Sequence, residues 1–436
     1  MKIAVIPIDN RPICYDLIKD ILAVDKNIEL FMPDIKDLGG LTTSANIDNL
    51  FDFIKNLPEI DYFIISLDTL AYGGLVSSRR CEDSFEEIKT RITNFKQEIS
   101  KKHCRVLAFS SIMRISNNNV NEEEKPYWDK WGKKIFDWSY NYHKNNIEKS
   151  DIPKDILYDY IKTRKRNFDI NLTYLNWAKE GFFDTLVFSK DDCAEYGLNV
   201  KEGLELKNHA LNNVFVKTGA DEIPLSLITR ALTQNKKIGI KPVFIENNIN
   251  LISKYEDITV KNCVLSQLGL AGLEIGDNLT FFINNFEKEQ GDLVLGDIVN
   301  ETKKEVRFPN TPYFIADINN ANGADNGFIE QLFKTNPNNL YSYCGYNTSA
   351  NSIGCAICLA VVKYLANSYD EKAFKKIMFI RFLDDWAYQN LARKQQNPTE
   401  VLNKNTDKIS AFLDFSFDKI NYSFPWNRSF EIRIKL

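Results

Sequence analysis

The stretch DYFIISLDTLAYGGLVSSRR, residues 61–80, contains the pattern that decides the fold. An apolar run at 62–67 is typical of a strand buried on both faces, and a carboxylate, Asp68, follows it directly. A glycine pair comes next, followed by two arginines, Arg79 and Arg80. The same order of an apolar run and then polar residues recurs along the chain, so we interpret this stretch together with the others.

Nine apolar runs are short, rich in β-branched and aromatic residues, and bounded by polar residues, as buried strands are. They are residues 2–8, 28–32, 62–67, 105–111, 185–189, 241–246, 279–284, 313–317 and 340–344. Segments with helical periodicity, such as 85–100 and 223–236, lie between them. This alternation predicts an α/β fold with a mostly parallel sheet, either barrel-like or two-lobed and doubly wound.

Two long segments depart from the alternation. Residues 115–183 are charged and rich in Tyr and Trp, which predicts a helical insertion, and residues 360–420 predict a helical C-terminal region. We place a domain boundary near residue 235. Residues 1–235 then form an N-terminal α/β region with the insertion, and residues 236–436 form a C-terminal α/β region that ends in helices.

The composition narrows the class of protein. The chain has 436 residues, of which 44% are hydrophobic, enough for a large core. A net charge of -4 favours neither nucleic acid nor an anionic membrane as a partner. The start MKIAVIPID contains no signal sequence, and no stretch of about 18 apolar residues occurs. We therefore expect a cytoplasmic protein whose partner is a small molecule or a saccharide; the sequence sets no oligomeric state.

Several common kinds of site have little support. The three histidines, His103, His143 and His209, lie in polar Lys- and Asn-rich contexts, which argues against a His-based triad. Cys355 and Cys358 have a CxxC spacing but lie in an apolar, helical run, so we interpret them as core residues. Neither of the glycine-rich nucleotide-binding motifs, GxxxxGK[ST] and GxGxxG, occurs, which argues against a nucleotide-binding site. We expect no cofactor, although a divalent metal stays open as an alternative.

Polar side chains cluster directly after the predicted strands. The carboxyl ends of parallel strands meet at one edge of a sheet, where ligands bind in α/β folds. Each single cluster also suits a turn or a helix cap, but their number favours an active-site edge. The candidate binding residues at these positions are Asp9, Arg11, Tyr72, Arg79, Arg114, Asp317, Asn319, Asn347 and Asn351.

Neighbouring carboxylates point to acid and base chemistry. Asp191 and Asp192 follow an apolar strand directly, and two acids in a confined site repel, so one keeps its proton near neutral pH. Such pairs perform general acid and base work on glycosides. We predict Asp191, Asp192 and Asp68 as catalytic residues. A second pair, Asp384 and Asp385, shares a helix face with an arginine and is a candidate for substrate binding or a structural ion-pair cluster.

A set of ordered motifs resembles one known family across nearly the whole chain. They are PIDNRP (7–12), SLDTLAYGGLVSSR (66–79), SKDDCAEYGLN (189–199), GADE (219–222), GYNTSANSIG (345–354) and RFLDDWAYQ (381–389). They resemble the bacterial family known as domain of unknown function 4127. The family often has Trp at the position of Tyr346 and Gly at that of Ala350, and neither change removes a charge. The resemblance implies no activity.

The residues support three alternative functions. The first is a hydrolase that acts on a glycosidic bond of a polar or anionic sugar-like substrate, with Arg11, Arg79 and Arg114 at an anionic substituent. The second is an Mg²⁺- or Mn²⁺-dependent enzyme whose oxygen ligands come from the aspartates that follow the strands. Those aspartates are Asp9, Asp68, Asp191, Asp192 and Asp317. The third is a binding protein that performs no chemistry.

Overall fold

The computed structural model describes residues 1–291 and 300–436. Contacts divide the chain into two compact units, and the chain passes between them more than once. Unit 1 contains Met1–Asn10, Glu29–Pro224 and Tyr255–Asp257, and unit 2 contains Arg11–Ile28, Leu225–Lys254 and Ile258–Leu436. The predicted boundary near residue 235 lies in the connection between helix α9 (Ile223–Thr233) and strand β7 (Gly239–Phe244) of unit 2.

Unit 1 is built on a six-stranded sheet in which every neighbouring pair is parallel, in the order β2-β1-β3-β4-β5-β6. Its strands are β1 (Lys2–Ile6), β2 (Glu29–Phe31), β3 (Tyr62–Ser66), β4 (Arg105–Ile112), β5 (Thr185–Lys190) and β6 (Val214–Thr218). Strands β3 and β5 are buried along their whole length, which explains their continuous apolar sequence. The chain order reverses between β1 and β3, which makes this edge a topological switch point.

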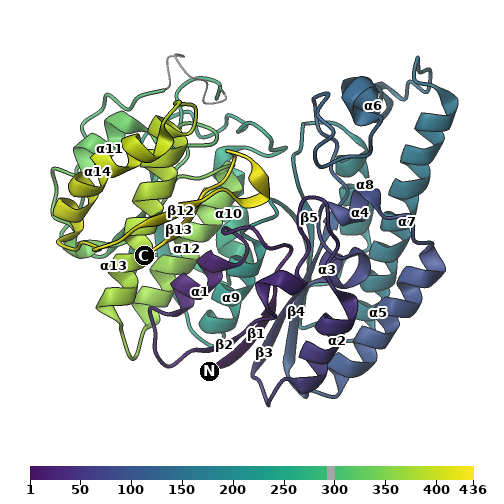
Figure 1. The fold of residues 1–436 in the computed structure, drawn as a ribbon, viewed down its shortest axis with the longest axis horizontal. Coiled ribbons are helices and arrows are strands. Elements are labelled where there is room, and N and C mark those ends of the chain that lie inside the picture. The colour runs from purple at the N-terminus through teal and green to yellow at the C-terminus, as the bar shows by residue number, and fades with distance from the viewer. Residues whose placement is uncertain (292–299) are drawn as a thin grey trace. The chain divides into compact units, whose positions relative to one another are not determined.

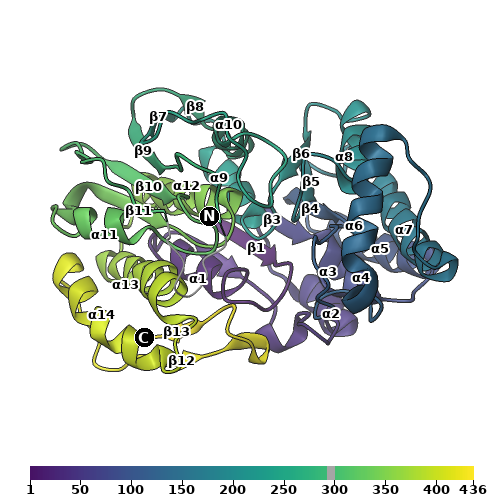
Figure 2. The same ribbon diagram turned by 90° about the horizontal axis from the view of Figure 1, so that it is seen from above.

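The helices of unit 1 include the predicted insertion. They are η1 (Ile35–Asp37), α2 (Ile47–Asn56), α3 (Leu67–Tyr72), α4 (Ser77–Arg80), α5 (Phe85–Ser100), α6 (Trp128–Asn145), α7 (Lys154–Lys179) and α8 (Leu198–Asn208). Figures 1 and 2 show α2, α5, α7 and α8 on one side of the sheet. Helices α6 and α7 confirm the insertion predicted at 115–183. They pack around a small core of their own that contains Trp128, Ile135 and Tyr160.

Unit 2 contains a second parallel sheet, in the order β11-β10-β9-β7-β8. Besides β7, its strands are β8 (Glu274–Ile275), β9 (Leu279–Asn284), β10 (Tyr313–Asp317) and β11 (Leu340–Cys344). Its helices are α1 (Asp16–Leu22), most of α9, α10 (Val260–Leu270), α11 (Asn326–Leu332), η2 (Pro337–Asn339), α12 (Ser349–Leu365), α13 (Glu371–Arg381), the π-helix η3 (Phe382–Ala392) and α14 (Pro398–Leu413). Residues 349–362 of α12 are all buried, which explains why this helix is apolar on every side.

The structure confirms an α/β fold with parallel sheets, and of the two predicted architectures it has the open, two-sheet one. The short strands β6 and β8 were not predicted. The helical C-terminal region is present, but the chain continues past α14 into η4 (Pro425–Asn427) and a two-stranded antiparallel hairpin. Its strands, β12 (Asn421–Ser423) and β13 (Arg433–Lys435), have three residues each, too few to give a periodic pattern.

Candidate active site

The carboxyl ends of β3, β4 and β5 bring predicted site residues together in unit 1. Asp68 lies in the first turn of α3, directly after β3, and its Oδ2 accepts the backbone N–H of Ser111 in β4 at 2.7 Å. Arg114 follows β4, and Asp191 and Asp192 follow β5. Because these strands are parallel neighbours, residues far apart in the sequence reach the same edge.

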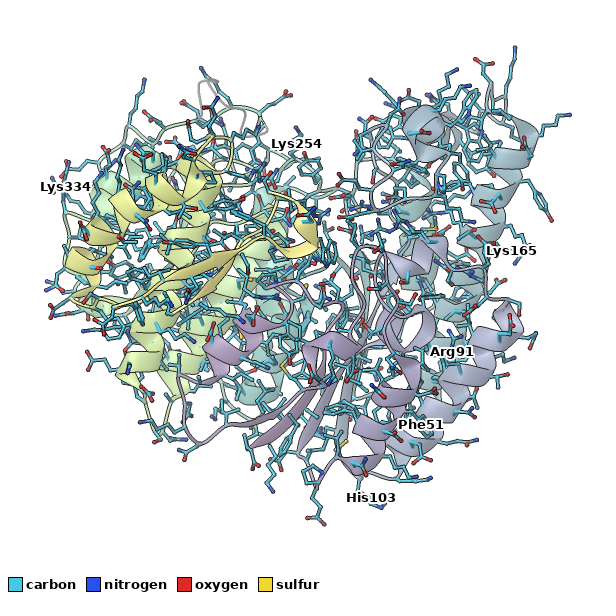
Figure 3. The ribbon with its side chains drawn as sticks, viewed as in Figure 1. Phe51, Arg91, His103, Lys165, Lys254 and Lys334 are labelled. Atoms are coloured by element: carbon cyan, nitrogen blue, oxygen red, sulfur yellow. The ribbon has the colours of Figure 1, made fainter. Side chains whose placement is uncertain are left out.

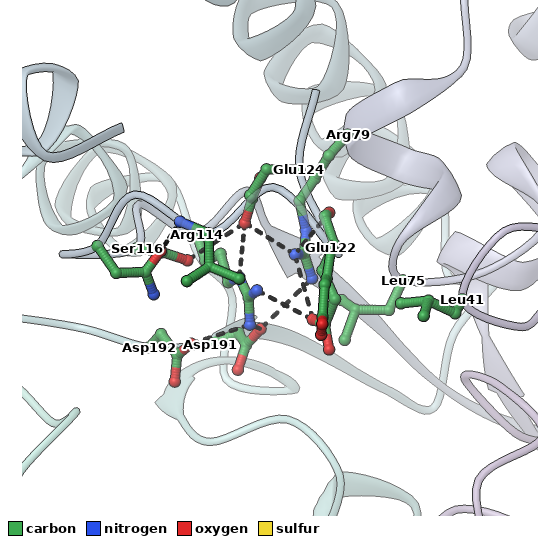
Figure 4. Close-up of polar contacts among 12 residues, drawn as sticks. Leu41, Leu75, Arg79, Arg114, Ser116, Glu122, Glu124, Asp191 and Asp192 are labelled. Carbon is green, nitrogen blue, oxygen red and sulfur yellow. Dashed lines mark hydrogen bonds and ion pairs between the residues drawn. The ribbon is translucent and has the colours of Figure 1, made fainter. Parts of the chain in front are cut away.

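Arg114 is the centre of an ion-pair cluster that Figure 4 shows. Its Nη1 donates to Oδ2 of Asp192 at 2.9 Å and lies 3.5 Å from Oδ2 of Asp191. On the other side, its Nε donates to Glu124 at 2.9 Å and its Nη2 lies 2.9 Å from Glu123. One guanidinium therefore contacts four carboxylates.

Arg79 and Arg80 are neighbours in the sequence but bind different groups. Arg79 is 1% exposed, and its Nη1 donates to Glu124 at 3.0 Å while its Nη2 lies 3.7 Å from Asp191. Arg80 instead donates to backbone carbonyls, to Glu124 at 2.9 Å and Leu41 at 3.0 Å among others. Arg79 offsets part of the negative charge of the acid cluster, and Arg80 holds the loop that supplies two of its acids.

Glu123 and Glu124 are site residues that the sequence analysis missed. They belong to the acid run NEEEK at 121–125, in the loop between β4 and α6. Glu124 is 3% exposed and also accepts from Ser116 Oγ at 3.2 Å. A buried acid in a run of glutamates has no local signature, because such runs are usually solvated. The signal available was the closeness of this run to Arg114 in the sequence.

The cluster carries more negative than positive charge, since four carboxylates meet two guanidinium groups. Burial and the neighbouring Asp191 raise the pKa of Asp192, and Arg114 opposes this shift. The side chain of Asp192 is nevertheless 30% exposed and that of Asp191 is 18% exposed. Asp192 also has a left-handed backbone with φ of 41°, a strained conformation that concentrates at functional sites. Asp192 is therefore the most exposed acid of this cluster, followed by Asp191 and Glu123 at 18% and 17%.

The other predicted residues of unit 1 are more deeply buried. Asp68 is 1% exposed, and burial raises its pKa to about 7. Tyr72 is buried in α3, and the guanidinium of Arg166 lies 5.5 Å from its ring centre. Asp9 follows β1 and is 2% exposed. Each of these side chains faces protein, so their contact with a substrate stays a prediction.

The glycine pairs of unit 1 serve loop packing. A Cβ on Gly39 would lie 2.1 Å from the carbonyl oxygen of Gly73, far inside contact distance. Gly73 itself has a φ of 87° and ends α3 in the left-handed conformation that favours glycine. At Gly73 the space that a side chain would need is taken by Ser44 and Ala45, which belong to the loop that carries Gly39.

The remaining predicted residues lie in unit 2, where Asp317 belongs to a closed network. Asp317 accepts from Asn284 at 2.9 Å, from the N–H of Asp325 at 2.8 Å and from the Tyr343 hydroxyl at 2.9 Å. Burial raises its pKa to about 7. Asn319 donates to Asp325 at 2.7 Å. The protein itself satisfies these groups at the ends of β9, β10 and β11.

Asp384 and Asp385 pair with Arg381, the last residue of α13, at 3.0 and 2.9 Å. Asp385 is fully buried and its Oδ2 accepts the N–H of Gly345, at the end of β11, at 2.7 Å. The predicted pairing is thus present. The helix that carries both acids is a π-helix, however, a rare form that is frequent at functional sites.

Arg11, Asn347 and Asn351 also lie in unit 2. Arg11 pairs with Glu431 at 3.2 Å. Asn347 has a left-handed backbone with φ of 64°. The N–H of Asn351 lies 3.4 Å from Oγ1 of Thr348, which caps α12 as the helix-cap interpretation expects.

Among residues 1–291 and 300–436, no group of three or more His, Cys, Asp or Glu side chains has an arrangement that could hold a metal ion. In the same residues, no helix combines the length and the apolar character needed to span a membrane.

Fold and site together define an α/β protein with two parallel sheets and an acid-rich cluster at the edge of one of them. The model of the family described as protein of unknown function (DUF4127) matches residues 3–419, nearly the whole chain. The chain belongs to this family, as its motifs indicated. Neither a curated protein nor a solved structure matches it.

Proposed function

We propose that the protein is a hydrolase that cleaves a glycosidic bond of a polar, sugar-like substrate, with Asp191 and Asp192 as the catalytic pair. One observation carries the proposal. Oδ2 of each aspartate contacts the same Arg114 nitrogen, at 3.5 and 2.9 Å. These two oxygens are therefore less than about 6.5 Å apart, which is compatible with the roughly 5 Å separation of a retaining pair.

Each aspartate has a role that fits its surroundings. Asp192, whose pKa is raised, gives its carboxyl proton to the glycosidic oxygen as the bond from that oxygen to the anomeric carbon breaks. Asp191, held by Arg79 and Arg114, donates an electron pair to the anomeric carbon and forms a glycosyl ester. Asp192 then takes a proton from water, whose oxygen attacks the anomeric carbon and releases the sugar and the Asp191 carboxylate.

The charge of the cluster bears on the substrate. We expected Arg79 and Arg114 to bind an anionic substituent, but both guanidinium groups already face protein carboxylates. An added anion would meet a net negative cluster, so the proposal favours a neutral or amine-bearing sugar. In this scheme Asp68 holds the end of β4, three residues before Arg114, through its bond to Ser111.

We also propose that the protein is cytoplasmic and that its partner is a small saccharide rather than a nucleic acid or a membrane. Its support is the net charge of -4 and the eight cysteines scattered without a framework of spacings.

The test is a set of chromogenic aryl glycosides that includes neutral, amino and uronic sugars. We expect turnover of a neutral or amino sugar by the full-length protein and a loss of at least about a hundredfold in Asp192→Asn. A matched 2-fluoro glycoside should label Asp191, which peptide mass spectrometry would show. Full turnover by a folded Asp192→Asn protein, loss of activity with EDTA, or recovery of every sugar unchanged would each reject the proposal.

A further inference from the structure

A groove in unit 2 is a second candidate binding site, separate from the residues of the proposed hydrolase. Residues of α11, η2, the π-helix η3 and α14 line it. Its volume is about 510 Å³, within the range of small-molecule sites. Phe333, Trp386 and Phe412 supply its aromatic wall, and Lys334, Lys408 and Glu330 supply its charges.

The aromatic wall is held in place by its own contacts. Phe333 stacks on Phe412 with ring centres 4.7 Å apart, and it meets Trp386 edge to face at 5.3 Å. The indole N–H of Trp386 is already used, because it donates to Oδ1 of Asn326 at 3.0 Å. Trp386 is 2% exposed and Phe412 is 7% exposed, so the half-buried ring of Phe333 is the aromatic surface that a ligand can reach most easily. Its ring contacts leave Phe333 little freedom to lose when a ligand binds.

Two ammonium groups lie beside this aromatic surface. Lys334 and Lys408 are exposed, and neither forms an ion pair within the part of the chain that the structure describes. Lys334 lies at the surface of the unit, among the outermost side chains in Figure 3. Nζ of Lys408 is 5.8 Å from the ring centre of Trp386. The one acid of the lining, Glu330, leaves the groove with a net positive charge.

We propose that this groove binds a small aromatic carboxylate. The ring of the ligand lies against Phe333 and the apolar lining beside it, and its carboxylate faces Lys334 and Lys408. The volume suits a molecule of one or two rings, and the unpaired lysines select an anion over a neutral or cationic analogue. The site does not depend on Asp191 and Asp192, so it stands or fails apart from the hydrolase proposal.

The test is calorimetric titration of the full-length protein with 2-naphthoate at low ionic strength, with 2-naphthamide as the uncharged analogue of the same shape. We expect saturable binding of the carboxylate and at least about fivefold weaker binding of the amide. The double variant Lys334→Glu, Lys408→Glu should bind the carboxylate at least about tenfold more weakly. Lys372→Glu, which changes an exposed lysine of α13 outside the groove, should bind it as the unchanged protein does.

Three results would overturn the proposal: no saturable binding of 2-naphthoate, equal binding of the amide, or an unchanged affinity in the double variant. Both altered lysines are exposed, so the variants are expected to fold, and thermal melting would verify this.

Discussion

Arg114 donates through Nη1 to Oδ2 of Asp192 at 2.9 Å, which joins the segment after β4 to the segment after β5. We predict that Arg114→Met lowers the free energy of unfolding by about 3–5 kcal/mol at pH 8, since it leaves buried carboxylates without their cation. The loss should be smaller at pH 5, because a raised pKa allows Asp192 to take up a proton there. Urea unfolding at both pH values measures this difference.

The control for this prediction is Arg105→Met in the same unit. Arg105 pairs with Asp184 at 3.0 Å, but both side chains are more than a third exposed. Exposed pairs of this kind contribute between about 0 and 1 kcal/mol. Equal losses in the two variants would mean that the Arg114 cluster behaves as an ordinary surface network.

Asp68 gives a pH prediction with a definite sign. Burial raises its pKa in the folded protein to about 7, from an ordinary value of 3.8. Between these values the folded state holds a proton that the unfolded state has lost, so the contribution of Asp68 to stability is complete below the lower value and disappears as pH rises through 7. We predict that Asp68→Asn makes the unfolding free energy fall less steeply from pH 5 to pH 8. Parallel pH profiles for the variant and the unchanged protein would refute this.

Asp385 ties the π-helix to the end of β11 in unit 2. Asp385→Ala leaves both the Gly345 N–H, 2.7 Å away, and one side of Arg381 without an acceptor. We predict a loss of about 3–5 kcal/mol in unfolding free energy, and a smaller loss for Asp385→Asn, which keeps one acceptor. Asp407→Ala, which changes an exposed residue of α14, should alter stability by less than about 0.5 kcal/mol. A similar small change in Asp385→Ala would show that the network contributes little.

The sequence was sufficient for most strands and for the convergence of Asp68, Arg114 and Asp192. The alternation of apolar runs with helical segments predicts parallel strands. In a parallel sheet the carboxyl ends of the strands lie at the same edge, so the residues that follow the strands meet there. That argument needs no side-chain contact. The pairing of Arg381 with the two acids after it was likewise predictable from their spacing along one helix.

The features that could not be predicted depend on tertiary contacts, which the local sequence does not show. Asp9 and Arg11 are two residues apart, yet they belong to different compact units, which no local pattern indicates. Glu124 enters the acid cluster through contacts with residues from separate segments, since Arg80 holds its backbone and Arg79 and Arg114 donate to its carboxylate. The π-helical turn after Arg381 likewise depends on how the helix packs, because its residues also suit an α-helix.

The close approach of two loops in unit 1 gives the last prediction, which concerns glycine. A Cβ on Gly39 would lie 2.1 Å from the oxygen of Gly73, and that neighbour is backbone rather than a flexible side chain. We predict that Gly39→Ala destabilises the protein by about 1–3 kcal/mol, because one of the two loops must move. In Gly269→Ala the new methyl group meets nothing within 4 Å, and the residue lies in α10. That variant should gain up to about 1 kcal/mol from helix propensity. Thermal and urea unfolding of the pair would show changes of opposite sign, and a stable Gly39→Ala protein would mean that the loops separate at little cost.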